Sequence, residues 1–144
     1  MGELSIGRSA TVLELAHWPI VPSMEIQYLN PLELAHDIVD LVEERKAEDI
    51  LLLDLRPDQI IADFFIICSG DNERHLRALT ESVRLVVKER YEKLPFSNEG
   101  RAENGWVVMD YGDVVVHFFA PDKRDYYGLE DLWDAASKVM LRIQ

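Results

Sequence analysis

The stretch that decides the fold is Trp106-Val-Val-Met-Asp-Tyr-Gly-Asp-Val-Val-Val-His-Phe-Phe119. Two β-rich runs flank its centre, so the stretch predicts a tight antiparallel hairpin. Gly112 supplies the positive φ that a two-residue hairpin turn requires, and Asp113 tolerates the second turn position. Because Trp106, Asp110 and His117 are residue types that can take part in chemistry, the hairpin could be an active site, a core element or a docking surface.

Outward from the hairpin, hydrophobic periodicity and turn residues predict the remaining elements. Asn30 is suited to cap a helix, and Pro31 suits its first turn. In chain order we expect a helix from Pro31 to about Ala47, strands over 50–55 and 63–68, a helix from about 73 to 93, a short strand within 94–100, and a C-terminal helix carrying Leu129, Leu132, Trp133, Ala136, Met140 and Ile143. This order predicts an α/β fold with a mixed sheet of about five strands and flanking helices.

The chain divides into three segments on the same grounds. Residues 1–29 hold Pro19 and Pro22 with no sustained period, and we expect them to be flexible or loosely docked. Residues 30–133 form the domain, and residues 134–144 form the end of the C-terminal helix or a tail.

Composition excludes several classes of protein. The net charge of −12 disfavours direct binding to DNA or RNA, which normally needs a basic surface, and fits a basic partner protein or simply solubility. No apolar run approaches the roughly 18 residues of a membrane span, and no secretory signal or transit peptide is visible. Cys68 lies in an apolar run and reads as a buried small hydrophobe, which fits a reducing cytoplasm.

Phosphate chemistry at the turn after the second strand is one candidate function. Ser69-Gly70 opens a helix and could direct backbone N–H groups at a phosphate. Nucleotidyltransferases with such a turn also need two carboxylates on a nearby strand to hold Mg²⁺, because Mg²⁺ prefers oxygen ligands. The available strand, Val114 to Phe119, carries no such pair. We therefore interpret the turn as a tight strand–helix connection.

Metal and nucleophile sites have no better support. His75, His117, Cys68 and Asp110 show no recognised ligand spacing, and His117 makes no nucleophile motif with Ser69 or Cys68. We predict no catalytic residue, no metal and no cofactor. Since His117 lies in an alternating strand, we interpret it as a structural or interface residue.

Trp106 stands at a loop-to-strand junction, where a tryptophan serves either as a core lid or as a protein-binding anchor. Strand alternation places Trp106 and Asp110 on one face and Met109 and Tyr111 on the other. Met109 and Tyr111 can therefore join Trp106 in one surface only if the strand twists or bulges near its start. Otherwise Trp106 belongs to the core.

Several of these motifs together resemble the ribosomal silencing factor (Iojap) family, and the similarity runs from about Pro31 to Trp133. The motifs that carry the resemblance are Asp63-Phe-Phe-Ile-Ile-Cys-Ser-Gly70, Arg74-His75, Glu99-Gly100, the hairpin from Trp106 to Phe119, and Tyr127-Gly-Leu-Glu-Asp-Leu-Trp133.

The resemblance implies a nucleotidyltransferase-like fold without its catalytic carboxylate pair. It implies binding to the large ribosomal subunit through ribosomal protein fourteen, steric blocking of small-subunit joining, and so repression of translation. Organellar relatives imply large-subunit assembly instead. Carried over by motif, the partner-binding residues would be Trp106, Met109, Asp110, Tyr111 and Tyr127.

The sequence departs from the family pattern in two respects, and alternatives for the function and for the oligomeric state stay open. The family commonly has a small hydroxyl residue soon after the turn glycine, whereas Asp71-Asn72-Glu73 follows Gly70 here. Residues 1–29 and 134–144 extend beyond the usual core. A divergent nucleotidyltransferase-type enzyme is the alternative function, and a homodimer formed through a sheet edge or through residues 1–29 is compatible with the sequence.

Overall fold

The computed structural model describes residues 30–56, 62–128 and 138–144, without the side chains of Tyr126, Tyr127 and Lys138. The expected N-terminal extension, 1–29, lies outside the described residues. One six-stranded sheet dominates the structure, with the strand order β4-β5-β6-β3-β2-β7. Its strands are β2 (Glu48–Asp54), β3 (Phe64–Ser69), β4 (Ser97–Arg101), β5 (Trp106–Asp110), β6 (Val114–Phe119) and β7 (Lys138–Ile143).

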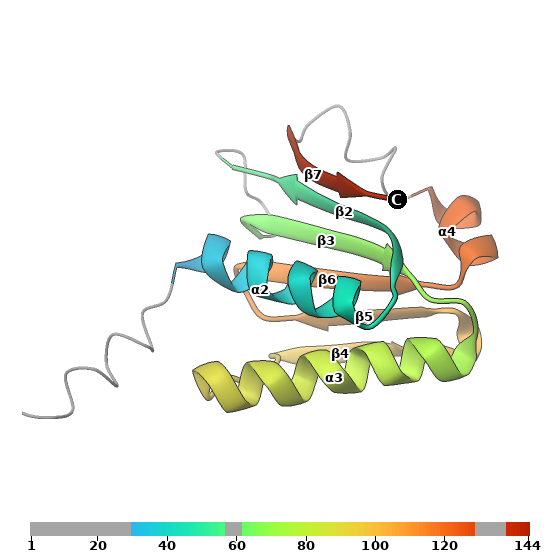
Figure 1. Ribbon diagram of the computed structural model, residues 1–144, viewed down its shortest axis with the longest axis horizontal. Helices are drawn as coiled ribbons and strands as arrows, with labels where there is room; N and C mark the ends of the chain where they lie inside the picture. The colour runs from blue at the N-terminus through green and yellow to red at the C-terminus, as the bar shows by residue number, and fades with distance from the viewer. Residues whose placement is uncertain (1–29, 57–61, 129–137) are drawn as a thin grey trace, which may run out of the picture.

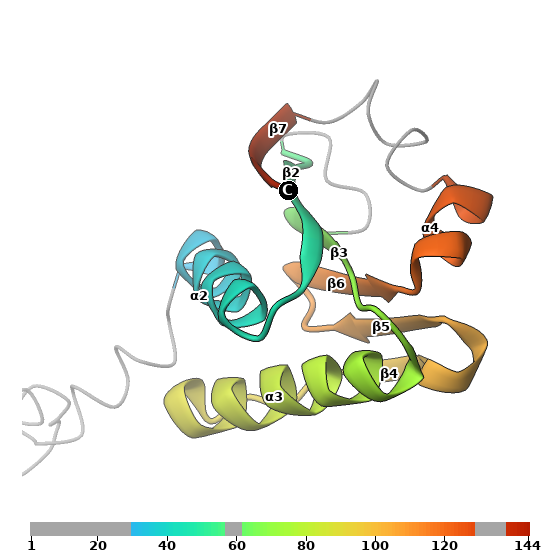
Figure 2. The ribbon, with the colours of Figure 1, turned by 45° about the vertical axis from the view of Figure 1, so that its right-hand side comes forward.

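The helices lie on both sides of the sheet (Figures 1 and 2). Helices α2 (Pro31–Glu44) and α3 (Glu73–Tyr91) cover one face, and the short helix α4 (Pro121–Tyr127) lies on the other side of the sheet. A 3₁₀ turn, η2 (Ala102–Asn104), joins β4 to β5. The predicted α/β class, with a mixed sheet and flanking helices, is therefore confirmed.

The predicted hairpin is confirmed. Strands β5 and β6 pair antiparallel from Trp106 opposite Phe119 to Asp110 opposite Val115, with no shift of register. The turn between them contains Gly112 at φ 92°, as the glycine-dependent turn requires. On its far side β6 pairs parallel with β3, so the hairpin joins the middle of the sheet through β6 and lies near its edge through β5.

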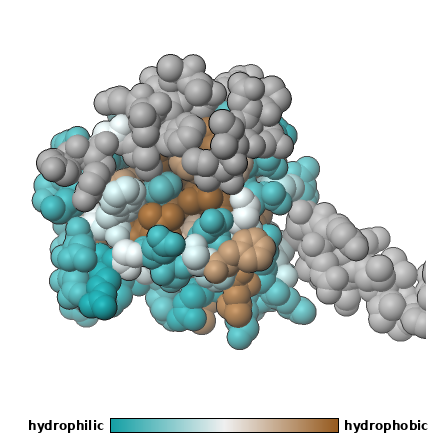
Figure 3. All heavy atoms as spheres, turned by 180° about the vertical axis from the view of Figure 1, so that it is seen from behind, coloured by the Kyte–Doolittle hydropathy of each residue, from teal (hydrophilic) through white to brown (hydrophobic). Residues whose placement is uncertain are grey.

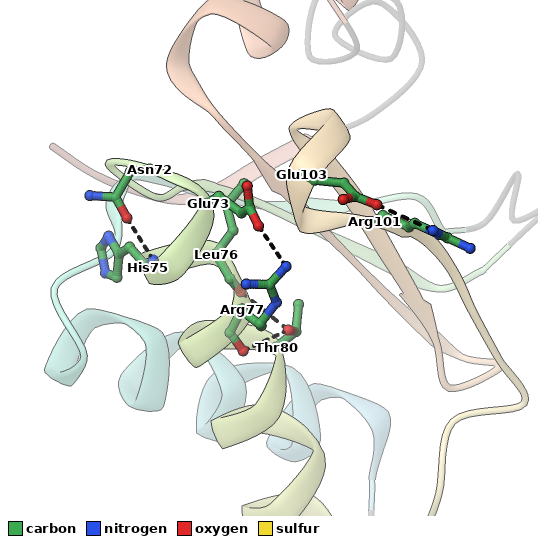
Figure 4. Close-up of polar contacts among 8 residues, drawn as sticks. All are labelled: Asn72, Glu73, His75, Leu76, Arg77, Thr80, Arg101 and Glu103. Carbon is green, nitrogen blue, oxygen red and sulfur yellow. Dashed lines mark hydrogen bonds and ion pairs between the residues drawn. The ribbon is translucent and has the colours of Figure 1, made fainter.

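The helix starts are also confirmed. The Asn30 side chain accepts a hydrogen bond from the backbone N–H of Leu32 at 2.8 Å, and Pro31 occupies the first turn of α2. At the start of α3, the Asn72 side chain accepts from the backbone N–H of His75 at 2.9 Å (Figure 4). Each cap satisfies a backbone donor that the first helical turn leaves without a partner. Helix α2 ends at Glu44, slightly before the expected Ala47.

His75 connects the two helices that cover the sheet. Its Nδ1 accepts a hydrogen bond from the backbone N–H of Asp71 at 2.9 Å, so the neutral ring carries its proton on Nε2. Nε2 lies 3.0 Å from the carbonyl oxygen of Arg45, just after α2, and donates to it. The imidazole therefore has a structural role, consistent with the absence of a metal-ligand spacing in the sequence.

The predicted C-terminal helix is wrong over residues 138–143. These residues form β7, which pairs antiparallel with β2 (Figure 1). A short apolar run satisfies helical and strand spacing equally well, and here the open edge of β2 offers backbone partners that a helix would not use. Strand β7 also raises the sheet from about five strands to six. Residues 129–137, which carried the rest of this prediction, lie outside the described residues.

Gly100 is the position in β4 where a side chain is least tolerated. It has φ 85°, and an added Cβ would collide with the carbonyl oxygen of Trp106 on the neighbouring strand. We predict that Gly100→Ala lowers the free energy of unfolding by more than about 1 kcal/mol, because alanine is strained at positive φ. Urea unfolding measures this change. Asn98→Ala, at an exposed position in the same strand, should stay within about 0.5 kcal/mol of the parent. Equal effects of the two substitutions would contradict the strain.

Candidate partner-binding face

The face of the sheet opposite α2 and α3 is called the rear face here. It carries Trp106, Val108 and Asp110 of β5 with their partners Phe119, His117 and Val115 of β6, because directly opposed residues point to the same side. The face continues over β3 and β2 as a buried apolar cluster: Leu51, Leu53, Leu55, Ala62, Phe65, Ile67, Val115 and Phe119. Figure 3 shows apolar side chains gathered near its centre, with polar ones around them.

Trp106 is half-buried at one end of this face. Its backbone is positioned by Gly105, which has φ 81° and accepts a hydrogen bond from the N–H of Ala120 at 2.9 Å. The indole stacks on Phe119, with ring centroids 5.0 Å apart and an interplanar angle of 24°. Its Nε1–H donates to Nδ1 of His117 at 3.3 Å. Trp106 is therefore held both by a ring contact and by a hydrogen bond while part of its surface stays accessible.

His117 lies at the centre of the rear face and is only 6% exposed. Its ring centroid is 4.9 Å from that of Phe65 on β3. Burial disfavours the charged imidazolium and lowers the pKa of His117 to about 4, so the ring is neutral near pH 7. Nε2 has no hydrogen-bond partner in the described part of the chain.

Met109 and Tyr111 lie on the opposite side of β5. Both are 0% exposed and belong to the core beneath α2 and α3. Burial also raises the pKa of the Tyr111 phenol to about 12. The expectation that these two side chains meet a partner is corrected, since neither reaches the surface. The reason is the regular register of β5, which has no bulge that could bring them beside Trp106.

Asp110 is half-buried on the rear face at the turn end of β5. Its carboxylate accepts a hydrogen bond from the backbone N–H of Gly112 at 2.7 Å, so it shapes the hairpin turn. Two further acids, Glu99 and Asp113, are exposed close by in the pairing scheme. Tyr127 ends α4, and its side chain lies outside the described residues. The structure thus brings Trp106 and Asp110 onto one face.

The Ser69-Gly70 turn is occupied by structural contacts. Ser69 is 2% exposed, and its Oγ accepts from Nη1 of the buried Arg124 at 3.0 Å. The same Nη1 donates to the carbonyl oxygen of Asp49. A cavity of about 270 Å³ beside this contact is lined by Arg124 and Arg142 but also by Asp49 and Asp125. Its opposing charges do not select for a phosphate.

Among residues 30–56, 62–128 and 138–144, no three His, Cys, Asp or Glu side chains lie close enough together to hold a metal ion. Asp54 pairs with Arg56 through two contacts of 3.0 Å, which give a cationic partner to a carboxylate in an otherwise apolar strand. No helix in the described part of the chain is long and apolar enough to cross a membrane.

Strand alternation alone places Val108 on the same face as Trp106 and Asp110, and the pairing confirms it. Sequence reasoning missed two other contributors to the rear face, Phe119 and Phe65. Phe119 could have been found by pairing the two hairpin strands, because it lies opposite Trp106. Phe65 lies on β3, and only the parallel pairing of β3 with β6, a contact distant in sequence, brings it to His117.

Comparison with known proteins decides the family. Residues 29–144 match the sequence model of a family described as "Ribosomal silencing factor during starvation". The chain belongs to this family. Ribosomal silencing factor RsfS from Halalkalibacterium halodurans is 39% identical over 109 residues, which cover 76% of this chain and 92% of that protein.

More distant relatives and solved structures agree. The mouse protein named "Mitochondrial assembly of ribosomal large subunit protein 1" is 31% identical over 106 residues, which cover 69% of this chain and 45% of that protein. A crystal structure of a protein from Chromobacterium violaceum superposes with a TM-score of 0.69 at 34% identity, covering 74% of this chain and 88% of that one. The family resemblance noted in the sequence is confirmed.

The correction for Met109 leads to a stability prediction. Met109→Ala removes a fully buried side chain and should lower the free energy of unfolding by about 2–5 kcal/mol. Leu85→Ala is the control, because Leu85 is 56% exposed on α3 and its truncation should change stability by less than about 1 kcal/mol. Urea unfolding of both variants measures the difference. A Met109→Ala protein as stable as the control would place Met109 outside the core.

The low pKa of His117 predicts that the stability of the fold depends on pH. Because the pKa lies below the ordinary 6.5, the unfolded chain binds the extra proton first as the pH falls. The stability linked to the neutral ring is complete above about pH 6.5 and is lost as the pH falls toward 4. Its size is about 3 kcal/mol, from roughly 1.4 kcal/mol for each tenfold change in proton affinity.

Urea unfolding between pH 7 and pH 4 tests this linkage as a difference between the parent and His117→Gln. The substitution should remove up to about 3 kcal/mol of the pH-dependent loss. His36→Gln, at an exposed position on α2, is the matched control. Parallel pH profiles for the parent and His117→Gln would show that His117 is not buried in its neutral form.

Proposed function

We propose that this protein binds the large ribosomal subunit through ribosomal protein fourteen and blocks joining of the small subunit. The observation that carries the proposal is the half-exposed Trp106, stacked on Phe119 and hydrogen-bonded to His117 on the rear face. Membership of the ribosomal silencing factor family supports the ribosomal part. The choice of ribosomal protein fourteen as the partner comes from the resemblance of the hairpin motif to that of the family.

The physical character of the rear face fits a protein partner. Tryptophan anchors are enriched among the residues that dominate interface energies, and an anchor held before binding loses less entropy when the partner arrives. Val108 adds partly exposed apolar surface beside Trp106. Asp110 and the exposed acids Glu99 and Asp113 supply a polar rim. Such a rim, with a net charge of −12, favours association with a basic ribosomal protein.

A non-enzymatic role is part of the same proposal. The relatives are named as silencing or assembly factors. The Ser69 hydroxyl is engaged by Arg124, and the nearby cavity mixes cations with carboxylates. A protein that binds the large ribosomal subunit must be in a compartment that contains ribosomes. This fits the cytoplasmic location expected from the sequence.

A second candidate function is assembly of the large subunit, favoured by the mouse relative, which is named for assembly of the ribosomal large subunit. It would use the same face, so affinity for the subunit cannot separate the two roles. A subunit-joining assay with mature particles can. Inhibition of joining at stoichiometric protein supports repression. Binding without inhibition would refute the blocking role and favour assembly.

Trp106→Ala provides the site test. We predict that binding to isolated large subunits and to purified ribosomal protein fourteen weakens by about 2 kcal/mol or more, roughly 30-fold, because the substitution removes the aromatic anchor. Equilibrium binding measures the change, with circular dichroism confirming the fold. Leu85→Ala, which truncates an exposed apolar side chain on α3, should bind like the parent. Unchanged affinity of folded Trp106→Ala would remove Trp106 from the interface.

A further inference from the structure

We propose that His117 is a positioning residue for partner binding: it fixes the orientation of Trp106, and the fold gives up some stability for this. The inference rests on the proposed function, because it assumes that Trp106 meets the partner. This orienting role goes beyond what the burial of the His117 ring or membership of the family implies.

The geometry makes His117 a directional partner for Trp106. Val108, not Trp106, lies directly opposite His117, so the indole must lean along the sheet to reach it. Such diagonal neighbours lie within reach of large aromatic side chains. Stacking on Phe119, with an angle of 24° between the rings, confines the plane of the indole. The hydrogen bond from Nε1 to Nδ1 of His117 then selects the direction of the indole edge within that plane.

This hydrogen bond also dictates the protonation of His117. The indole N–H can only donate, so Nδ1 must accept and the proton of the neutral ring lies on Nε2. That Nε2–H is buried and has no acceptor in the part of the chain that the structure describes. Leaving a buried donor without an acceptor is unfavourable. The tautomer that holds Trp106 is thus the one that leaves a donor unsatisfied.

A purely structural role would favour a different residue. The neighbours of His117 on the rear face include Phe65, Phe119 and Val108, so an apolar ring would fill the same space without an unsatisfied N–H. Departures from the most stable choice are expected where a residue serves function. The feature that phenylalanine lacks is the acceptor that orients the indole.

Two substitutions separate these roles. His117→Phe keeps a ring of similar shape but removes the acceptor, whereas His117→Gln loses the ring but can offer a side-chain oxygen to the indole. His36→Phe, at an exposed position on α2, is the matched control. Three quantities are measured on the full chain: stability in urea, solvent exchange of the Trp106 indole N–H by NMR, and affinity for large subunits. The Trp106 signal is assigned with Trp106→Phe.

We expect His117→Phe to be at least as stable as the parent, with indole exchange and subunit dissociation constant each raised roughly 2- to 10-fold, the range for loss of one hydrogen bond. His117→Gln should recover part of both losses, and His36→Phe should change neither. A His117→Phe variant with parental exchange and parental affinity would overturn the proposal. So would one that is markedly less stable yet binds normally, because that pattern marks a structural residue.

A double-mutant cycle tests whether His117 acts through Trp106. In the Trp106→Ala background, His117→Phe should weaken subunit binding no further, because the indole that it orients is gone. Additive losses would show that His117 contacts the partner independently and would overturn the positioning role. If the parent chain binds no large subunits, the proposed function fails on its own. The indole exchange rates of free parent and His117→Phe still decide whether His117 orients Trp106.

Discussion

The unbroken pairing of β5 with β6 is the constraint on which the rest of the structure depends. With no bulge between Trp106 and Asp110, every second side chain of β5 is committed to the helix-covered core and every other one to the rear face. Met109 and Tyr111 anchor α2 and α3 against the sheet for this reason, and Trp106 and Asp110 are left to the other side. The hairpin is therefore both a core element and a candidate docking surface, one for each face.

A second junction fixes the end of the sheet where Ser69-Gly70 turns into α3. Asp49 has φ 50° at an irregularity in the register of β2, and its carbonyl oxygen accepts from Arg124 of α4. The same guanidinium holds the Ser69 hydroxyl. One buried cation thus ties α4, β2 and β3 together. In a phosphate-binding protein the turn would leave its hydroxyl and N–H groups for the ligand. Because Arg124 already occupies the Ser69 hydroxyl, the turn has a structural role.

Sequence motifs predicted the structure correctly at positions where the conformation depends only on neighbouring residues. Asn30, Pro31 and Gly112 have roles that depend on backbone geometry alone, and each performs the predicted one. The failures concern partners distant in the sequence. Residues 138–143 became a strand because β2 offered an open edge, which no spacing within the segment reveals. Carrying Met109 and Tyr111 over from a motif ignored which face each residue occupies, although strand alternation already separated them from Trp106.

The same geometry links the oligomeric state to the proposed function. A homodimer formed through the rear face would bury Trp106 and would compete with the ribosome. A homodimer formed through the outer edge of β4 would leave Trp106 accessible. That edge carries exposed Glu99 and Arg101, and charged side chains on an edge strand discourage further pairing.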